Sequence, residues 1–305
     1  MAAPKTRNGD TPKGFKNLLD DLLEEMRNGV APWTRPWVRT AGMPMNGASG
    51  RPYNGGNRGW LWIHSMVRGF DQNIFLTFNQ AKKLDGRVKK GSRGMNIVRP
   101  RVIQVENEET GELEDRFLGF FLHTVFNVCD IEFDDPRVVK GYTALDERPE
   151  DTLPSGFDSV KAFVNNGMAH IEYGGDRAFY SRSEDMIRLP GRNKFESDAA
   201  FYGVLIHELA HWTGGKSRMD RPFGRPGTDK YAREELVAEL AAAFVMNSLG
   251  HDGMLQHPQY LKSYTAHLGQ GYETMFEVFP TASKVADDLL QRFQEAITAP
   301  GRQAA

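Results

Sequence analysis

The five residues from 207 to 211 read His-Glu-Leu-Ala-His, and they are the residues of this sequence best suited to chemistry. On a helix, residues four apart lie on one face, so the imidazoles of His207 and His211 can bind one metal ion. Imidazole nitrogens suit Zn²⁺, at Zn–N distances of about 2.0–2.1 Å. Glu208 would then lie beside the metal, where its carboxylate can take a proton from an attacking water. The spacing therefore predicts a zinc-dependent hydrolytic site with Glu208 as its general base.

A site of this kind needs a third protein ligand, because zinc enzymes use three and leave a fourth position open. Glu235 and Glu239 fall four residues apart in a second helix-forming segment, which extends from residue 231 to about 249. Their neighbours are largely apolar, and a carboxylate buried among them needs a partner. We expect Glu235 to be the third ligand and Glu239 to orient a histidine. Glu234 and Asp220 are the competing third ligands.

The segments around these residues carry the signals of the elements that must position them. Ser197 is suited to an N-cap and Asp198 to the positive end of a helix, while Gly214 and Gly215 supply the stop. We expect a final amphipathic helix after an N-cap at Thr281, over residues 282–297. Three short strands are expected at residues 169–173, 178–181 and 186–189. This layout matches the zincins, in which the last strand edges the cleft and can pair with a substrate peptide.

The composition indicates a globular chain with two domains. At 305 residues the chain can bury two cores, and 40% of its residues are hydrophobic. The single cysteine, Cys129, excludes an internal disulfide framework and suits a reducing cytosol. No apolar run approaches the ~20 residues of a membrane span, and the N-terminus has no apolar signal core. We therefore expect a cytoplasmic protein that has no membrane partner.

The fold class that we expect is α+β, in two parts. A small N-terminal α+β DNA-binding domain would occupy residues 1–133, with a flexible arm at 1–12. An amphipathic helix at 15–27 and an antiparallel pair of strands, at 95–105 and 116–128, belong to it. Residues 134–154 are rich in Pro, Asp and Glu and would form a linker. Residues 155–305 would form a zincin-like metallopeptidase domain, built from a short sheet and the helix that carries the His-Glu-x-x-His motif.

The net charge of −2 hides a strong asymmetry between the two parts. Residues 1–104 contain 18 Lys and Arg against 7 Asp and Glu, whereas the remainder contains 20 against 33. A basic half of this size is the electrostatic footprint of a protein that binds a phosphate backbone. The charge distribution therefore favours a nucleic acid as the partner of the first half.

Aromatic side chains alternate with Arg, Asn and Gly between residues 51 and 62, and a second basic cluster lies between residues 82 and 93. Flat side chains stack on unpaired bases, at about 1–3 kcal/mol per base, while cations neutralise phosphates. Duplex bases are already stacked, so this mixture favours single-stranded DNA. About half of the tryptophans at positions 33, 37, 60 and 62 are expected to be core residues instead. The candidate DNA-binding residues are Arg51, Tyr53, Asn57, Arg58, Trp60, Lys82, Lys83, Arg87, Lys89, Lys90 and Arg93.

Several stretches of the second half carry a pattern beyond the metal motif itself. They are residues 174–181 (Gly-Gly-Asp-Arg-Ala-Phe-Tyr-Ser), 202–214, 216–218 (Lys-Ser-Arg) and 231–244, and residues 91–94 and the stretch with Tyr53, Asn57 and Trp60 fit in the first half. Over about residues 13–298 the sequence resembles the ArdC-type antirestriction proteins carried by conjugative plasmids and phages. The motifs of the second half are the more specific ones.

The resemblance implies an N-terminal domain that binds single-stranded DNA, a C-terminal zinc-peptidase-like domain, and protection of incoming plasmid or phage DNA from host restriction. It implies metal ligands at His207, His211 and Glu235, with Glu208 as the general base. The protein substrate would be a host restriction enzyme subunit or another protein of the bacterial cytoplasm. Other divalent metals can replace Zn²⁺ in vitro, because selectivity rests on geometry and availability.

Two other functions remain open at the level of the sequence. The chain could coat single-stranded DNA while its metal site serves a structural or regulatory purpose. It could also be a peptidase with an incidental basic domain. Glu208 argues against a structural site, since such a site does not require a base. Binding to single and double strands at several salt concentrations separates the second possibility from the others.

Overall fold

The first helix, α1 (Lys13–Arg27), forms because its apolar residues recur at helical spacing and cover one face. The computed structural model describes residues 4, 10–29, 41–107, 111–135, 138, 142, 156–251 and 264–298. Gly29 follows α1 with a φ of +83°, a conformation that glycine adopts without strain, so the helix ends where the sequence predicts. The buried residues of α1 are Gly14, Phe15, Leu18, Leu19, Leu22, Leu23 and Met26.

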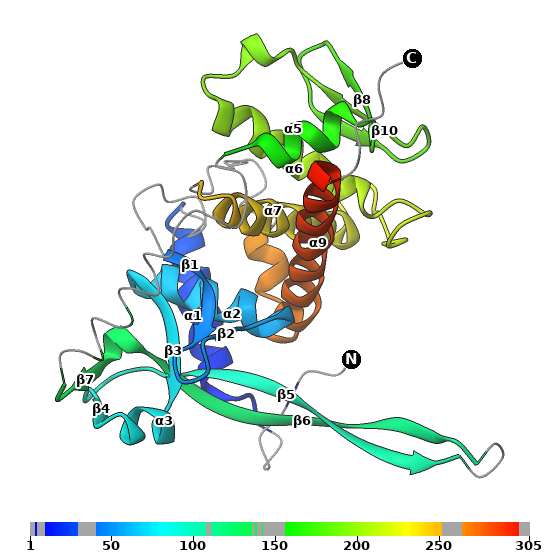
Figure 1. Cartoon of the computed structure of the whole chain (residues 1–305). Coiled ribbons are helices and arrows are strands. Elements are labelled where there is room, and N and C mark those ends of the chain that lie inside the picture. The colour runs from blue at the N-terminus through cyan, green and yellow to red at the C-terminus, as the bar shows by residue number, and fades with distance from the viewer. Residues whose placement is uncertain are drawn as a thin grey trace.

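A five-stranded sheet forms the centre of the first half, in the order β2-β1-β3-β6-β5. Only β1 and β3 pair in parallel, and the other neighbours are antiparallel. The predicted strand pair is confirmed as β5 and β6, which are long and form a projecting ribbon (Figure 1). The strands are β1 (Ala41–Asn46), β2 (Arg51–Pro52), β3 (Gln72–Thr77), β5 (Met95–Glu106) and β6 (Leu113–Asn127).

A smaller unit lies beside this sheet and carries much of the basic cluster. The short helix α3 (Phe78–Lys83) begins at Thr77, whose side chain forms a capping box with Gln80. It leads into β4 (Gly86–Val88), which pairs antiparallel with β7 (Ile131–Phe133) after the short 3₁₀ turn η2 (Val128–Asp130).

The helix α2 (Gly55–Arg68) occupies the stretch in which we expected aromatic residues to meet DNA. Trp60 and Trp62 are no more than 1% exposed, so both belong to the core. The Trp60 ring packs edge-on to Phe15 of α1, with ring centroids 4.9 Å apart. The expectation that some of these tryptophans are core residues is therefore confirmed for this pair, while residues 33 and 37 lie outside the described residues.

The second half contains α5 (Asp158–Asn165) and a three-stranded sheet of β8 (His170–Tyr173), β9 (Phe179–Ser181) and β10 (Met186–Leu189). All three strands lie where the sequence predicts them. The spatial order is β8-β10-β9, with β10 parallel to β8 and antiparallel to β9. The expectation that the last strand edges the cleft was wrong, because β10 is central and β9 lies at the edge of the sheet.

Three long helices complete the second half, namely α6 (Asp198–Trp212), α7 (Asp229–Ser248) and α9 (Glu273–Thr298). A short 3₁₀ turn, η3 (Arg192–Lys194), precedes α6. The side chain of Ser197 accepts a hydrogen bond from the Ala200 amide at 3.0 Å, which confirms the predicted N-cap of α6. None of the described helices is both long and apolar enough to span a membrane.

The last helix begins earlier than the sequence indicates. Thr281 is not its N-cap, because α9 runs through Pro280 and the Thr281 hydroxyl donates to the Glu277 carbonyl at 2.6 Å. A proline inside a helix removes one backbone hydrogen bond, which made residue 280 look like a boundary. Burial of Met275, Val278 and Phe279 ahead of it favours the longer helix.

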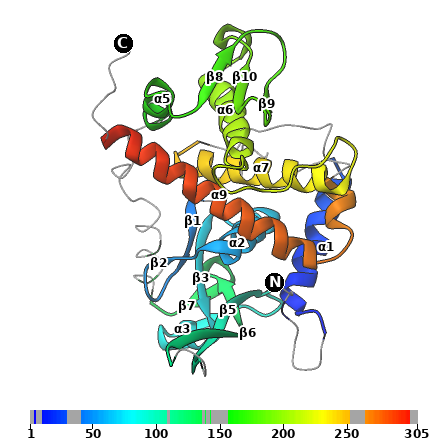
Figure 2. The same cartoon turned by 90° about the vertical axis from the view of Figure 1, so that its right-hand side faces the viewer.

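The helix α9 connects the two halves of the molecule, since it packs against both α7 and α2 (Figure 2). One buried apolar cluster continues from α1 and α2 through α9 to α6 and α7. The division into residues 1–133, a linker at 134–154 and residues 155–305 stays a prediction, since most of residues 134–154 lie outside the described residues. The continuous cluster means that the C-terminal helix serves the cores of both halves.

Candidate metal centre

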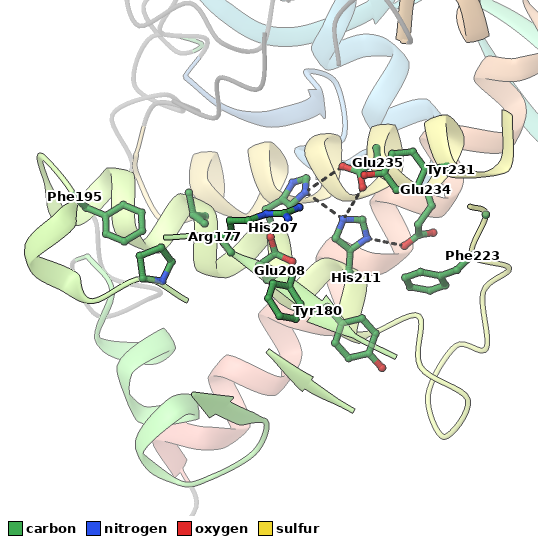
Figure 3. Close-up of a pocket in the computed structure, with 15 residues that line it drawn as sticks. Arg177, Tyr180, Phe195, His207, Glu208, His211, Phe223, Tyr231, Glu234 and Glu235 are labelled. Atoms are coloured by element: carbon green, nitrogen blue, oxygen red, sulfur yellow. Dashed lines mark hydrogen bonds and ion pairs between the residues drawn. The ribbon is translucent and has the colours of Figure 1, made fainter. Parts of the chain in front are cut away.

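Two helices, α6 and α7, bring the candidate ligands together. His207 and His211 project from α6 toward Glu235 on α7, and all three side chains are buried (Figure 3). The two imidazole Nε2 atoms lie 3.2 Å apart. The carboxylate oxygens of Glu235 lie 3.7 Å from each of these nitrogens. The side chains predicted to share a metal therefore point at one small volume.

The spacing of these atoms fits a metal ion. Ligands that bind a tetrahedral Zn²⁺ at about 2.0–2.1 Å lie ~3.3 Å from one another. The three observed separations bracket that value, and the ligand atoms all lie within 4.8 Å of one another. Two imidazoles and one carboxylate, which could leave a fourth position open, are also the donor set of catalytic zinc sites.

The outer nitrogen of each imidazole faces a second carboxylate. His211 Nδ1 lies 3.2 Å from Glu234 Oε1, and His207 Nδ1 lies 3.5 Å from Glu239 Oε2. Such carboxylates fix the tautomer and the orientation of a histidine, so that its other nitrogen faces the metal. The orienting role of Glu239 stays a prediction, and Glu234 lies in the same relation to His211.

The competing third ligands have other partners. The guanidinium of Arg221 donates to both oxygens of Glu234, at 2.6 and 3.1 Å, so this carboxylate is held behind His211. Asp220 is exposed and pairs with Arg182 at 2.9 Å. Among the described residues, the metal-compatible group of three consists of His207, His211 and Glu235. Glu235 is therefore the third ligand that we propose.

The electrostatics of the metal-free site follow from this packing. Burial on its own lowers the pKa of His211, but the hydrogen bond and charge of Glu234, with Glu235 and Glu208 nearby, raise it to about 9. Burial likewise raises the pKa of Glu235, and the two histidines outweigh it and bring the pKa to about 2. A metal ion must displace the proton of His211, so its binding releases a proton and tightens as the pH rises.

An open cleft of about 520 Å³ leads to the metal centre. Glu208 lines it beside the two histidines, and Ala178, Phe179 and Tyr180 of the β9 region form another part of its wall. Figure 3 shows Arg177, Tyr180 and Tyr231 around the same space. The Glu208 carboxylate, three metal-compatible side chains and the edge of a sheet therefore meet in one cleft.

Sequence reasoning missed the side chains that hold this cleft in place. Arg221 is 7% exposed and, besides Glu234, donates to the Ala210 carbonyl and the Thr213 hydroxyl, each at 2.6 Å. It lies in a loop, where residue periodicity carries no signal. The sequence around Arg221 therefore does not predict that this arginine is buried.

The candidate DNA-binding residues divide into two groups in the structure. Lys82 and Lys83 are exposed on α3, Lys90 is exposed in the turn after β4, and Arg51 is exposed on β2. Arg87 is exposed beside Asp134, and Lys89 donates to the Cys129 carbonyl at 2.9 Å. Arg93 is exposed near Asp21. These side chains can reach a phosphate without disturbing the core.

The other candidates hold the protein together. Trp60 is 1% exposed and cannot stack on a base unless the core opens, so its inclusion among the DNA-binding residues was wrong. Arg58 bridges α2 to α9 by donating to Asp287 and to the Ser283 carbonyl, at 2.6 and 2.7 Å. Asn57 exchanges two hydrogen bonds with the backbone of Val98, and the Tyr53 hydroxyl accepts from Asn46 at 3.2 Å.

The fold and the metal centre define a two-part protein whose second part is a zincin-like metallopeptidase domain. Residues 158–281 match the family model of zincin-like metallopeptidases, and residues 13–126 match that of the N-terminal domain of the anti-restriction factor ArdC. The metal-free crystal structure of the antirestriction ArdC protein from plasmid R388 is 31% identical, with a TM-score of 0.69. That similarity covers 93% of this chain and 99% of the other. The chain therefore belongs to the ArdC family of antirestriction proteins.

The chain is also similar to other proteins. The Mn(II)-bound structure of the same ArdC protein is 29% identical over 92% of this chain and 97% of the other, with a TM-score of 0.66. Two DNA primases TraC of Escherichia coli are 31% and 30% identical over 96% and 92% of this chain. The chain spans only 21% and 27% of their lengths. The uncharacterized protein y4eC of Sinorhizobium fredii is 28% identical, over 92% of this chain and 93% of y4eC.

Proposed function

We propose that this protein binds single-stranded DNA through its basic N-terminal half and cleaves a protein substrate with a zinc-dependent peptidase site in its C-terminal half. Acting in the bacterial cytoplasm, it would thereby protect incoming plasmid or phage DNA from host restriction. The observation that carries the proposal is the buried group of His207, His211 and Glu235, with Glu208 in the same cleft. A structural metal site has no need of an adjoining base or of a cleft.

The roles of the residues in the cleft follow from their positions. The metal, when bound, would polarise the scissile carbonyl and lower the pKa of a water molecule. Glu208 would accept a proton from the attacking water and deliver it to the leaving amide nitrogen. Tyr231 also lines the cleft and hydrogen-bonds to the Glu235 carboxylate, so it would help to orient that proposed ligand.

Zinc is the metal that we propose, because two imidazoles and a carboxylate form a typical catalytic zinc set. The same donors accept Mn²⁺ and Co²⁺, and a related ArdC protein has been crystallised with Mn(II). Comparing cleavage with each of these metals tests the choice of zinc.

The proposal is tested by mixing the purified protein with host restriction subunits and single-stranded DNA, with and without added zinc. We expect new peptide fragments, identified by their masses, that disappear when a chelator removes the metal. A matched reaction without DNA shows whether occupancy of the basic half affects cleavage. Intact subunits under all these conditions, across zinc, manganese and cobalt, would contradict the peptidase part of the proposal.

Glu239→Gln should weaken metal binding about 10- to 100-fold, because the amide no longer provides the charged acceptor beside His207 Nδ1. Competition with a chromogenic chelator measures the change. Glu295→Gln, an identical change on the exposed face of α9, is the control and should leave the affinity unaltered. Equal metal affinities for the Glu239 variant and the control would show that Glu239 does not contribute to metal binding.

Binding of oligo-dT should weaken with salt, with a slope of about −0.7 in log K against log salt for each neutralised phosphate. The double variant Lys82→Ala/Lys83→Ala should therefore make the slope of log K against log salt less steep by about 1.4. Lys161→Ala, on exposed α5, serves as the control. Fluorescence anisotropy over a salt series gives both slopes. A slope near zero for the unaltered protein would contradict phosphate binding altogether.

A further inference from the structure

The strands β5 and β6 continue past the body of the protein as a two-stranded ribbon (Figure 1). Val98 is held to α2, because its amide donates to Asn57 at 2.9 Å and its carbonyl accepts from Asn57 at 2.8 Å. Beyond this anchor we use the name projecting ribbon for the described residues 99–107 and 111–121. Their pairing continues to Glu106 and Leu113, with one register shift between the Pro100 and Val102 pairs.

The projecting ribbon exposes apolar side chains that a two-stranded structure cannot bury. Six of the eleven large apolar side chains that are exposed among the described residues lie on it. Phe117 is 44% exposed and Phe121 is 47% exposed, whereas the aromatic residues of α1 and α2 are almost fully buried. Exposed apolar side chains gathered on one element in this way mark an interaction site. The full set is Val102, Ile103, Leu113, Phe117, Leu118 and Phe121.

One face of the ribbon combines arginines with an aromatic ring. Arg99 lies directly opposite Phe121, and residues opposite each other on antiparallel strands share a face. Arg101, two residues along β5, is on the same face, with its guanidinium carbon 5.6 Å from the centre of the Phe121 ring. Arg116 pairs with Ile103 and adds a third cation to this face. The cations therefore lie beside a ring that solvent can reach.

The opposite face of the ribbon is aromatic and apolar. Phe120 is paired with Pro100 and Phe117 with Val102, so their side chains share this face. The rings of Phe117 and Phe120 pack edge to face, with centroids 5.0 Å apart. A flat ligand could therefore stack against either face of the ribbon.

The charge of the ribbon changes along its length. Its described residues 99–105 and 116–121 contain three arginines and no Asp or Glu, whereas its described residues 106–107 and 111–115 contain four Asp and Glu. The arginine-bearing part is also continuous in sequence with the basic turn, because Lys89, Lys90 and Arg93 directly precede β5. A polyanion would therefore be attracted to the turn and the near part of the ribbon, and repelled by its tip.

We propose that the near part of the projecting ribbon, with Phe117, Phe121, Arg99 and Arg101, is the base-stacking element for single-stranded nucleic acid. This inference rests on the proposed function and assigns it a location that the sequence did not indicate. Phe121 lies beside Arg99 and Arg101 on one face, Phe117 is exposed on the other face, and no carboxylate lies among these four side chains. Exposed rings and cations on one element are the combination that binds unpaired bases and their phosphates. Paired bases offer no free face to a ring, so duplex DNA gains only the phosphate contacts.

The test measures oligo-dT binding by fluorescence anisotropy for the full chain and two double variants. Phe117→Ala/Phe121→Ala should weaken binding about 10- to 100-fold and leave the salt slope unchanged, because stacking is removed and phosphate contacts remain. Arg99→Ala/Arg101→Ala should weaken binding and reduce the steepness of the salt slope by about 1.4. All four side chains are exposed, so the variants should keep the fold, and circular dichroism checks this.

Two controls sharpen the measurement. Tyr173→Ala removes an exposed aromatic ring from β8, in the other half of the chain, and should not affect binding. Phe121→Trp keeps a flat ring and should bind at least as tightly as the unaltered protein. Its added indole fluorescence should be quenched by oligo-dT, as expected for a ring stacked on a base.

The outcomes separate the inference from the function on which it rests. If the unaltered protein binds oligo-dT while the phenylalanine variant binds equally well, the ribbon inference is overturned and the proposed function stands. If the unaltered protein does not bind, both are overturned. If the phenylalanine variant changes only the oligomeric state in sedimentation, the ribbon is a protein interface and the inference is overturned.

Discussion

Glu208→Gln is expected to lower peptide cleavage about 10²- to 10⁴-fold while the protein binds its metal as tightly as before. Glutamine has nearly the same size as glutamate, but its amide cannot accept the proton of the attacking water. Glu208 lines the cleft and is not one of the three metal-compatible ligands, so the change should act on the chemistry and not on the metal. Fragment masses and a metal competition assay on the same preparation measure both quantities.

Glu235→Gln, on α7, tests a proposed metal ligand and can be compared with Glu208→Gln, which tests the proposed base. The same chemical change at a proposed ligand should lower metal affinity, and cleavage should then be recovered in part by excess zinc. Excess zinc should not rescue Glu208→Gln. Full cleavage by the Glu208 variant would show that another group is the base, and loss of its metal would make Glu208 a structural residue.

The helix α6 and its partner α7 could be predicted from the sequence because their signals are local. His207 and His211 are four residues apart, and Glu235 and Glu239 repeat the same interval. Helical periodicity alone therefore places each pair on one face. That the two faces meet follows from the apolar residues around them, which must be buried together. The three strands and the cap at Ser197 were predictable for the same local reasons.

The features that sequence analysis missed depend on contacts distant in the chain. The Gly and Asn residues at 54–59 indicate a loop, but burial of Trp60 and Trp62 against α1, α7 and α9 stabilises the helix α2. Thr281 was expected to cap the last helix, but burial of the residues ahead of it favours a helix that continues through Pro280. The spatial order of β8, β9 and β10 depends on how the strands pair with one another, and the residues of a single strand do not determine it.

A buried ion pair beside the metal centre joins Arg221 to Glu234. Their side chains are 8% and 6% exposed, and the guanidinium also satisfies the Ala210 carbonyl and the Thr213 hydroxyl. Burial raises the pKa of Glu234, but its hydrogen bonds with His211 and Arg221 and their charges outweigh this effect and lower the pKa. Glu234 is therefore held as a carboxylate in the interior, behind a proposed metal ligand. Its stability there depends on the arginine.

Arg221→Met should lower the free energy of unfolding by about 3–5 kcal/mol, because it leaves the buried Glu234 carboxylate with His211 as its remaining partner and removes the donor to the Ala210 carbonyl and the Thr213 hydroxyl. Urea unfolding in the presence of a chelator measures this, since bound metal would add its own stabilisation. Arg87→Met, at the exposed pair with Asp134, is the control and should not change stability measurably. The double variant Arg221→Met/Glu234→Met should recover much of the loss, because replacing both partners removes the unpaired charge. A single variant as stable as the Arg87 control would show that Glu234 does not depend on Arg221.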